Sequence, residues 1–405
     1  MKVVRLSPVD HIFTGPGAYP IQFLLQYSCH LDPDELHKGL KSITPLFWPV
    51  AGRLQEYSDQ TYEVAWDGTI PSFEVFNRLD QTLPNPSDFK TLLGMRRSID
   101  SSIGNPLSYF SLYQFNDGSA LVANISHCIA DGHSFFHFLS QWAARVKSGP
   151  IKFLKNRIFA RPIHKRYMLV PKRRETGKLQ YTDQEVFRKL GISYSQESRE
   201  QDAKNGAWQF HNISEQEIRY YQEKDDAQHQ DRKRLSSDDI ISALIVKKFI
   251  AEGWFFYDPA RISTALDYRR ILPNVKRRYF GNAVRAASFE MSVEQMEEMT
   301  EIEIAKQVRR AKESINFENT LESLRYLETT RLGRDAGLQF VQGMRVADDA
   351  RGLLITNISR VSPDHFDFGY GKPTQLIPLT HAERTAVIIS QEGGYSVRVS
   401  PPNET

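Results

Sequence analysis

A histidine and an aspartate stand four residues apart in the stretch NISHCIADGHSFFHFLSQWA, at His127 and Asp131. The stretch leaves a β-rich run and enters a segment with apolar residues at helical spacing, namely Phe135, Phe138, Leu139 and Trp142. We therefore expect His127 and Asp131 on a strand-to-helix turn. A neutral histidine there can act as a general base, because its unperturbed pKa is about 6.5. A histidine that only hydrogen-bonds the backbone is equally possible, and for a lone histidine it is the more common case.

Two further chemistries are possible for this stretch. A metal site would use His127, Asp131, His133 and His137. His133 and His137 have the i, i+4 spacing of zinc-binding helices, but Ser134 stands where the zinc-protease pattern has a glutamate. A Cys128 thiolate activated by His127 is also conceivable, although neighbours on a strand face opposite ways. Both chemistries are disfavoured relative to the general base.

A second stretch with chemical potential is HFDFGYGKP, residues 365–373. Its Asp367-Phe368-Gly369 is the magnesium-binding tripeptide of protein kinases. The HRD tripeptide and the glycine-rich loop of kinases are missing from this sequence. The kinase interpretation therefore fails, and the glycines indicate a tight turn around Tyr370.

The elements that position these residues are readable as a mixed α and β pattern without a repeat period. Asp32-Pro33 predicts a helix start, and Asn116-Asp117-Gly118 predicts a hairpin between LSYFSLYQF and SALVANISH. Ser236 and Asp239 predict a capped helix over LSSDDIISALIVKKFI. The hairpin places His127 at the end of its second strand.

Composition restricts the class of protein. The chain has 405 residues, enough for about two domains, with 40% hydrophobic and 25% charged residues. A net charge of +3 gives no general attraction to nucleic acid or acidic lipid. Two cysteines, no apolar secretory stretch at the amino terminus and no membrane-spanning run predict a cytoplasmic protein without a disulfide framework, and we expect a monomer.

The clearest shift in composition lies between the two halves. From Lys152 to Lys178 there are ten lysines and arginines against one acid, Glu175. A solvated crossover between domains is the favoured interpretation and a dedicated anion site is the alternative. We place the domain boundary within this segment.

Together, HCIADG and DFGYG resemble the H-x-x-x-D-G and D-F-G-W-G motifs of the BAHD family of coenzyme A-dependent acyltransferases. Three other stretches are similar to the family in the same order: LSPVDHI at 6–12, FWPVAGRL at 47–54 and YFGNAV at 279–284. The resemblance extends from Leu6 to Pro373. It implies an α/β fold with mixed sheets, in which two chloramphenicol acetyltransferase-like domains enclose an active-site channel.

The resemblance also implies domain limits. We expect residues 1–165 to form the amino-terminal acyltransferase domain, completed by a segment near 372–391. Residues 166–205 are expected to be the crossover linker and residues 206–405 the carboxyl-terminal acyltransferase domain.

The resemblance assigns roles to individual residues. His127 matches the catalytic histidine, and Asp131 matches a structural aspartate paired with an arginine in a segment like ALDYRRIL. Arg269 is the better match for that arginine and Arg270 a near competitor. Thr356 matches a threonine of the active centre. Gly281 and Asn282 match residues near the coenzyme A arm, and Asp367, Gly369 and Gly371 match the structural motif remote from the chemistry.

Two positions depart from the family pattern. Tyr370 replaces the tryptophan of D-F-G-W-G. Ile358 stands where many members have a tryptophan, which removes an aromatic wall and a hydrogen-bond donor. An acceptor cannot therefore be borrowed from the phenolic-ester members of the family.

The expected activity is O- or N-acyl transfer from acyl-coenzyme A, as co-substrate, to a small-molecule alcohol or amine in secondary metabolism. His127 would be the base, Thr356 or a backbone amide would stabilise the oxyanion, and no acyl-enzyme would form. Coenzyme A phosphates would meet Lys276, Arg277 and Arg278. No permanently bound cofactor, metal, nucleic acid or membrane is expected. A condensation domain using a carrier-bound donor and a metal-dependent hydrolase are the alternatives.

Overall fold

Two mixed sheets carry the fold, and the first of them carries His127. The computed structural model describes residues 1–15, 18–170, 192–194, 208–228, 234–345, 352–380 and 382–402, with the backbone alone for 150–160. The first sheet has five strands in the order β14-β2-β7-β6-β5. Their bounds are β2 (Pro20–Tyr27), β5 (Ser72–Arg78), β6 (Ser108–Phe115), β7 (Ser119–Ser126) and β14 (Gln375–Pro378).

The expected hairpin joins β6 to β7 in this sheet. Phe115 N donates to the carbonyl oxygen of Gly118 at 2.8 Å, which closes the turn. A Cβ atom added at Gly118 would lie 2.1 Å from the carbonyl oxygen of Tyr27, so the neighbouring strand β2 leaves space only for glycine. The hairpin fixes the register of β7 and thereby the position at which His127 leaves the sheet.

Helices α1 (Pro33–Ile43) and α3 (Gly132–Ala160) pack together on the first sheet. Asp32 caps α1 as expected, because its carboxylate accepts from the amides of Asp34 and Glu35. Trp142 of α3 is fully buried and contacts Phe110 and Phe138. A smaller sheet and short helices surround this layer: β1 (Lys2–Arg5), β3 (Arg53–Ser58), β4 (Thr61–Trp66), α2 (Phe89–Gly94), η1 (Asp10–Phe13), η3 (Trp48–Ala51) and η4 (Arg166–Leu169).

The second sheet has six strands in the order β11-β10-β13-β15-β16-β9. Their bounds are β9 (Gln209–Ser214), β10 (Ala260–Asp267), β11 (Val284–Met291), β13 (Gly352–Asn357), β15 (Thr385–Gln391) and β16 (Gly394–Ser400). Helices α5 (Glu215–Gln228), α6 (Ser237–Ala251), α7 (Val293–Glu298) and α8 (Glu301–Glu313) lie beside it. The expected capping box of α6 is present, since Ser236 and Asp239 exchange hydrogen bonds.

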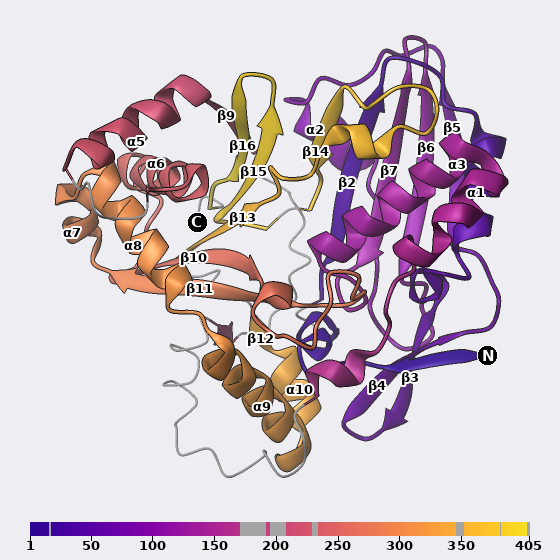
Figure 1. The fold of residues 1–405 in the computed structure, drawn as a ribbon, viewed down its shortest axis with the longest axis horizontal. Coiled ribbons are helices and arrows are strands. Elements are labelled where there is room, and N and C mark those ends of the chain that lie inside the picture. The colour runs from indigo at the N-terminus through magenta and orange to yellow at the C-terminus, as the bar shows by residue number, and fades with distance from the viewer. Residues whose placement is uncertain are drawn as a thin grey trace.

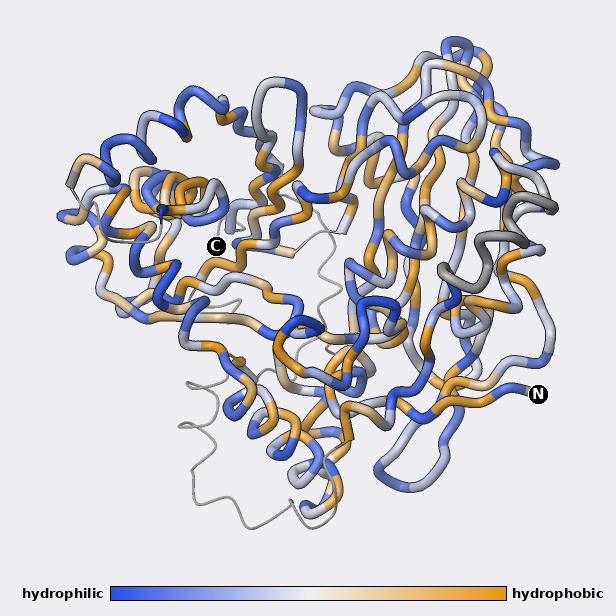
Figure 2. Tube along the Cα trace, viewed as in Figure 1, coloured by the Kyte–Doolittle hydropathy of each residue, from blue (hydrophilic) through white to orange (hydrophobic). Residues whose placement is uncertain are grey.

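The remaining described elements belong to neither of these two sheets. They are α9 (Phe317–Gly333), α10 (Gly337–Gln342), β8 (Ser193–Tyr194), β12 (Met344–Arg345), η6 (Tyr268–Arg270) and η7 (Pro363–Phe366). Figure 2 shows hydrophobic residues along the strands of the first sheet and a largely hydrophilic α5 on the outside. The fold class expected from the sequence, a mixed α/β chain with two sheet-based halves, is confirmed.

The division of strands and core residues between the two sheets does not follow the order of the sequence. Of the segment 372–391, Gln375–Pro378 pairs with β2 and completes the first sheet, whereas Thr385–Gln391 pairs with β13 in the second. Figure 1 shows β14 beside β2. In addition, buried residues between 268 and 286 pack in the same hydrophobic core as β7 and α3. The sequence order of strands therefore does not decide which sheet they join.

Most of the expected linker, 166–205, lies outside the described residues. Arg166 is described, and its side chain is 1% exposed. The interpretation of the basic stretch as solvated is therefore wrong at this position. The physical reason is a buried partner, Asp10, which lies beneath the turn that carries His127.

Candidate active site

The ring of His127 is held between two aromatic side chains at the carboxyl end of β7. Its backbone amide donates to the carbonyl oxygen of Tyr19 at 3.2 Å. The ring stacks on Phe13 of η1 with centroids 3.8 Å apart and an interplanar angle of 12°. Tyr19 contacts the ring edge-on, with centroids 5.0 Å apart. His127 is half-buried, so its ring plane is fixed by packing while part of it stays accessible.

Asn282 determines which ring nitrogen of His127 carries the hydrogen. Its Nδ2 donates to the carbonyl oxygen of His127 and to Oδ1 of Asp10, each at 2.7 Å. Because both partners only accept, Oδ1 of Asn282 must face the ring, where it lies 3.0 Å from Nδ1. An amide oxygen cannot donate, so Nδ1 of a neutral His127 holds the hydrogen. The other nitrogen, Nε2, is then a proton acceptor.

A buried ion pair fixes Asn282 in turn. Oδ2 of Asp10 lies 2.7 Å from Nη1 of Arg166, and both side chains are almost completely buried. Arg166 also donates to the carbonyl oxygens of Cys128 and Ile129, which belong to the turn after His127. Arg166 of this pair thus holds the backbone of the turn, and Asp10 orients the side chain of Asn282. Each residue of this ion pair lies in a stretch discussed from the sequence. Asp10 lies in LSPVDHI, to which no individual role was assigned, and Arg166 lies in the basic stretch that was interpreted as exposed.

Asp131 and Arg269 form the ion pair expected from the sequence. Nη1 and Nη2 of Arg269 donate to the two carboxylate oxygens of Asp131 at 2.7 and 2.9 Å. Burial alone raises the pKa of Asp131, but the charge of Arg269 and hydrogen bonds from Arg269, Ser134 and Ala283 lower it to about 2. The competitor Arg270 is exposed. Asp131 is therefore a charged cap of α3 that points away from His127 into a structural pair.

Ser134 locks the YFGNAV segment onto the first turn of α3. Its hydroxyl accepts from the amide of Gly281 at 3.1 Å and lies 3.0 Å from the carbonyl oxygen of the same residue. Arg269 donates to that carbonyl oxygen as well, also at 3.0 Å. These hydrogen bonds connect the first turn of α3, which packs in the first core, to the YFGNAV loop from the second half of the chain. Both segments are adjacent to His127 in the structure.

Comparison with known proteins identifies the family. Residues 4–400 match the family described as the Transferase family. The chain is a BAHD transferase.

Similarity to individual BAHD relatives is low and partial. The hydroxycinnamoyl-CoA:5-hydroxyanthranilate N-hydroxycinnamoyltransferase HHT1 of Avena sativa is 27% identical over 131 residues, which are 31% of this chain and 30% of the relative. Hydroxycinnamoyltransferase 2 of Oryza sativa subsp. japonica is 26% identical over 129 residues, 30% of this chain and 29% of the relative. The chain therefore spans less than a third of the length of these curated relatives.

Solved structures agree with the BAHD fold over nearly the whole chain. TRI101 of F. sporotrichioides, solved with coenzyme A and T-2, has a TM-score of 0.73 and 17% identity, covering 98% of this chain and 94% of that one. Vinorine synthase has a TM-score of 0.67 and 16% identity, covering 99% and 90%. The first condensation domain of the CDA synthetase has a TM-score of 0.62 and 13% identity, covering 98% and 91%.

The DFGYG motif of this BAHD chain forms a closed turn. Oδ1 of Asp367 accepts from the amides of Gly369 and Gly371 at 2.7 and 2.9 Å. Both glycines have positive φ, 103° and 99°, which residues with a Cβ rarely adopt. Oδ2 of Asp367 pairs with Lys147 of α3. The motif ties the late part of the chain to α3, and its geometry is that of a structural element.

The other residues expected at the BAHD active site lie on different elements from His127. Thr356 is half-buried on β13 of the second sheet, whereas His127 follows β7 of the first. Lys276, Arg277 and Arg278 are exposed, and the carbonyl oxygen of Arg277 is 2.8 Å from Nε2 of His133 in the first turn of α3. This basic group therefore lies beside the helix start that follows the His127 turn.

The residues considered for a metal site or a reactive thiolate make other contacts in the structure. His133 bonds the backbone of Arg277, and His137 packs edge-on against Phe47. Within the described residues, no three histidine, cysteine or acidic side chains converge as metal ligands would. Cys128 is buried, which raises the pKa of its thiol to about 12. Every helix in the described part of the chain is too short or too polar to traverse a lipid bilayer.

Proposed function

We propose that the chain moves an acyl group from an acyl-coenzyme A thioester to a hydroxyl or amine of a small molecule, with His127 as general base. The observation that carries this proposal is the hydrogen bond between Nδ1 of His127 and Oδ1 of Asn282, which leaves Nε2 as the proton acceptor. Family membership supplies the reaction class, and the fixed tautomer supplies a base suited to it.

The reaction follows from this arrangement in two steps. Nε2 of His127 removes the acceptor's proton as its oxygen or nitrogen attacks the thioester carbonyl, which forms a tetrahedral oxyanion. Thr356 or a backbone amide would donate to that oxygen. The intermediate then expels the thiolate of coenzyme A, which takes the proton from Nε2. The high pKa of Cys128 argues against a thiolate nucleophile, so no acyl-enzyme is required.

The decisive experiment is a screen of acyl-coenzyme A thioesters against pooled alcohols and amines, read by product mass and by release of free thiol. Product formation that depends on both substrates would support the proposal, and the mass would distinguish oxygen from nitrogen acceptors. Thiol release without an acylated product would instead indicate a thioesterase. No turnover in any pool would count against the acyltransferase.

Replacing Asn282 with alanine should lower kcat by about tenfold with little change in KM, because the base would lose its fixed tautomer while its ring stays stacked on Phe13. Nitrogen chemical shifts of the His127 ring check the cause directly. They should report hydrogen on Nδ1 in the wild type and a mixture of tautomers in the variant. Unchanged shifts would remove Asn282 from its role as a positioning residue.

Lys276, Arg277 and Arg278 are the proposed contacts for the phosphates of coenzyme A, because they are exposed beside the first turn of α3. Changing Arg277 and Arg278 together to glutamine should raise KM for acyl-coenzyme A several-fold and leave kcat nearly unchanged, as loss of uniform binding requires. The salt dependence of kcat/KM should flatten, since exposed charges are screened over about 8 Å at physiological ionic strength.

A double change on α5, Arg219→Gln with Lys224→Gln, removes the same charge elsewhere and should leave KM unaltered. A pantetheine thioester, which lacks the nucleotide, tests the alternative carrier. If it serves the wild type as well as acyl-coenzyme A does, and the Arg277 and Arg278 variant behaves normally, a condensation-type enzyme with a carrier-bound donor gains support. The fold similarity to the first condensation domain of the CDA synthetase is the observation that favours this second candidate.

A further inference from the structure

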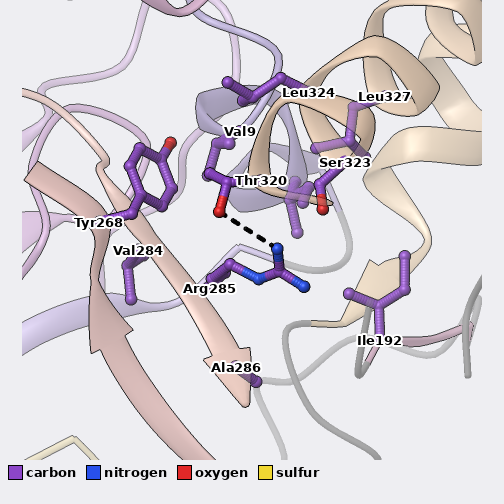
Figure 3. A pocket seen from close by; sticks show the side chains of 11 residues that line it. Val9, Ile192, Tyr268, Val284, Arg285, Ala286, Thr320, Ser323, Leu324 and Leu327 are labelled. Carbon is purple, nitrogen blue, oxygen red and sulfur yellow. Dashed lines mark hydrogen bonds between the residues drawn. The ribbon is translucent and has the colours of Figure 1, made fainter. Parts of the chain in front are cut away.

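A pocket lies between the amino-terminal η1 region, β11 and α9, beside the elements that hold His127. Its walls are mainly apolar, with Val9 and Ile12 on one side and Leu324 and Leu327 of α9 on another. Figure 3 shows the guanidinium group of Arg285, from β11, reaching into the space between these walls. A single cation in an apolar pocket calls for a physical explanation, because burying a charge is unfavourable unless it is paired.

The hydrogen-bonding capacity of Arg285 is only partly used. The residue is 8% exposed, and its Nη1 donates to Oδ1 of Asn319 at 3.1 Å and to Oγ1 of Thr320 at 3.4 Å. Its Nε is buried and has no hydrogen-bond partner in the described part of the chain. The partners of Nη1 are neutral, and Glu322 influences the guanidinium only through space. Burial lowers the pKa of Arg285 to about 10, which reflects the missing countercharge.

We propose that this pocket binds the carboxylate of a small molecule with an apolar body, and that Arg285 is the partner of that carboxylate. A carboxylate would supply both the countercharge and an acceptor for the unused donors of the guanidinium. The apolar side chains around Arg285 would cover the part of the apolar body that enters this small pocket, and the rest would extend from its opening. An uncharged ligand could fill the space but would leave the cation unpaired.

The pocket is joined to the candidate active site through shared residues. Tyr268 lines the pocket, and its hydroxyl donates to the carbonyl oxygen of Asn282 at 3.3 Å. Ile12 lines it as well, and the next residue, Phe13, stacks on His127. Resting on the proposed acyl transfer, the carboxylate would belong to one of the two substrates. It is either a group on the acceptor or the far end of a dicarboxylic acyl chain.

Direct binding tests the pocket without requiring turnover. The probes are 4-phenylbutyrate and its amide, 4-phenylbutyramide, which share an apolar body and differ in charge. Calorimetry on the wild type should give at least about tenfold tighter binding of the acid, because charge-assisted hydrogen bonds are roughly twice as strong as neutral ones. Arg285→Gln should abolish that preference and Arg285→Lys should keep part of it. Equal binding of acid and amide to the wild type would overturn the proposal.

Control variants separate a lost site from a lost fold. Arg219→Gln removes an exposed arginine of α5 and should preserve the preference for the acid. Thermal melting reports whether Arg285→Gln is folded. If it is not, Ser323→Phe, which keeps Arg285 and narrows the pocket, decides the matter: loss of acid binding supports the site, and undiminished binding refutes it.

Two kinetic comparisons identify the source of the carboxylate. Succinyl-coenzyme A against butyryl-coenzyme A tests the acyl chain, and a hydroxy acid against its methyl ester tests the acceptor. The relevant pair should show a kcat/KM preference for the acid that Arg285→Gln removes. Acid binding in the calorimeter without any transfer would defeat the proposed function and leave the pocket intact. Transfer without any dependence on a carboxylate or on Arg285 would defeat the pocket alone.

Discussion

His127→Ala is expected to lower kcat by at least about 10²-fold, because a positioned general base contributes about 10² to 10⁴ to such reactions. The loss should appear in kcat more than in KM, since Nε2 takes up the proton only as the new bond forms. Thiol release from acyl-coenzyme A in the presence of the acceptor found by the screen measures both constants.

The matched control is His37→Ala. His37 is exposed on α1 and stacks on Phe73, so its removal takes away a histidine without touching the β7 turn. Its kcat should equal that of the wild type. Near-normal turnover by a folded His127→Ala protein would show that the general base is another group.

Arg269→Ala is expected to lower the free energy of unfolding by roughly 3 to 5 kcal/mol, because it leaves the carboxylate of Asp131 buried without its partner. In the wild type, Arg269 and the hydrogen bonds hold the pKa of Asp131 at about 2, so the carboxylate is charged at neutral pH. Without Arg269, burial raises that pKa, and the variant must either keep an unpaired buried charge or protonate the carboxylate, both of which cost stability. Urea unfolding of both proteins measures the difference. The carbonyl oxygens of Tyr279 and Gly281 lose donors as well, so the YFGNAV segment should loosen with the turn.

The contrast with a surface pair makes this result interpretable. Lys38 and Glu35 of α1 form an ion pair 2.9 Å apart with side chains 69% and 49% exposed. Lys38→Ala should leave the free energy of unfolding nearly unchanged, as is usual for exposed pairs. If Arg269→Ala were equally harmless, Asp131 would not depend on Arg269, and the turn would have to be held by Arg166 alone.

Local features of this chain were predictable because they depend on neighbours in sequence. The cap of α1 at Asp32, the capping box at Ser236 and the hairpin at Gly118 each involve residues a few positions apart. The distant pair of Asp131 and Arg269 was predictable for another reason, namely the motif resemblance on both sides. Physical patterns alone would not have distinguished Arg269 from Arg270.

The remaining features depend on contacts that no local pattern encodes. Asp10 sits in a short amino-terminal motif and Arg166 in a basic stretch, and nothing in either segment indicates that they meet under His127. The tautomer of His127 is even harder to predict from the sequence, because it follows from the orientation of the Asn282 side chain. Arg285 reads as an ordinary charged strand residue until the pocket around it is known.

The insertion of β14 into the first sheet affects how the protein is made. During synthesis the first half of the chain leaves the ribosome without Gln375–Pro378, so β2 remains an open edge beside β7 until nearly all residues have been translated. Open edges invite pairing with other chains. A fragment that stops between the two halves would keep that edge permanently, and it would also lack the Arg269 and Asn282 contacts of the His127 turn. Expression as separate halves should therefore give aggregation rather than an independent amino-terminal domain.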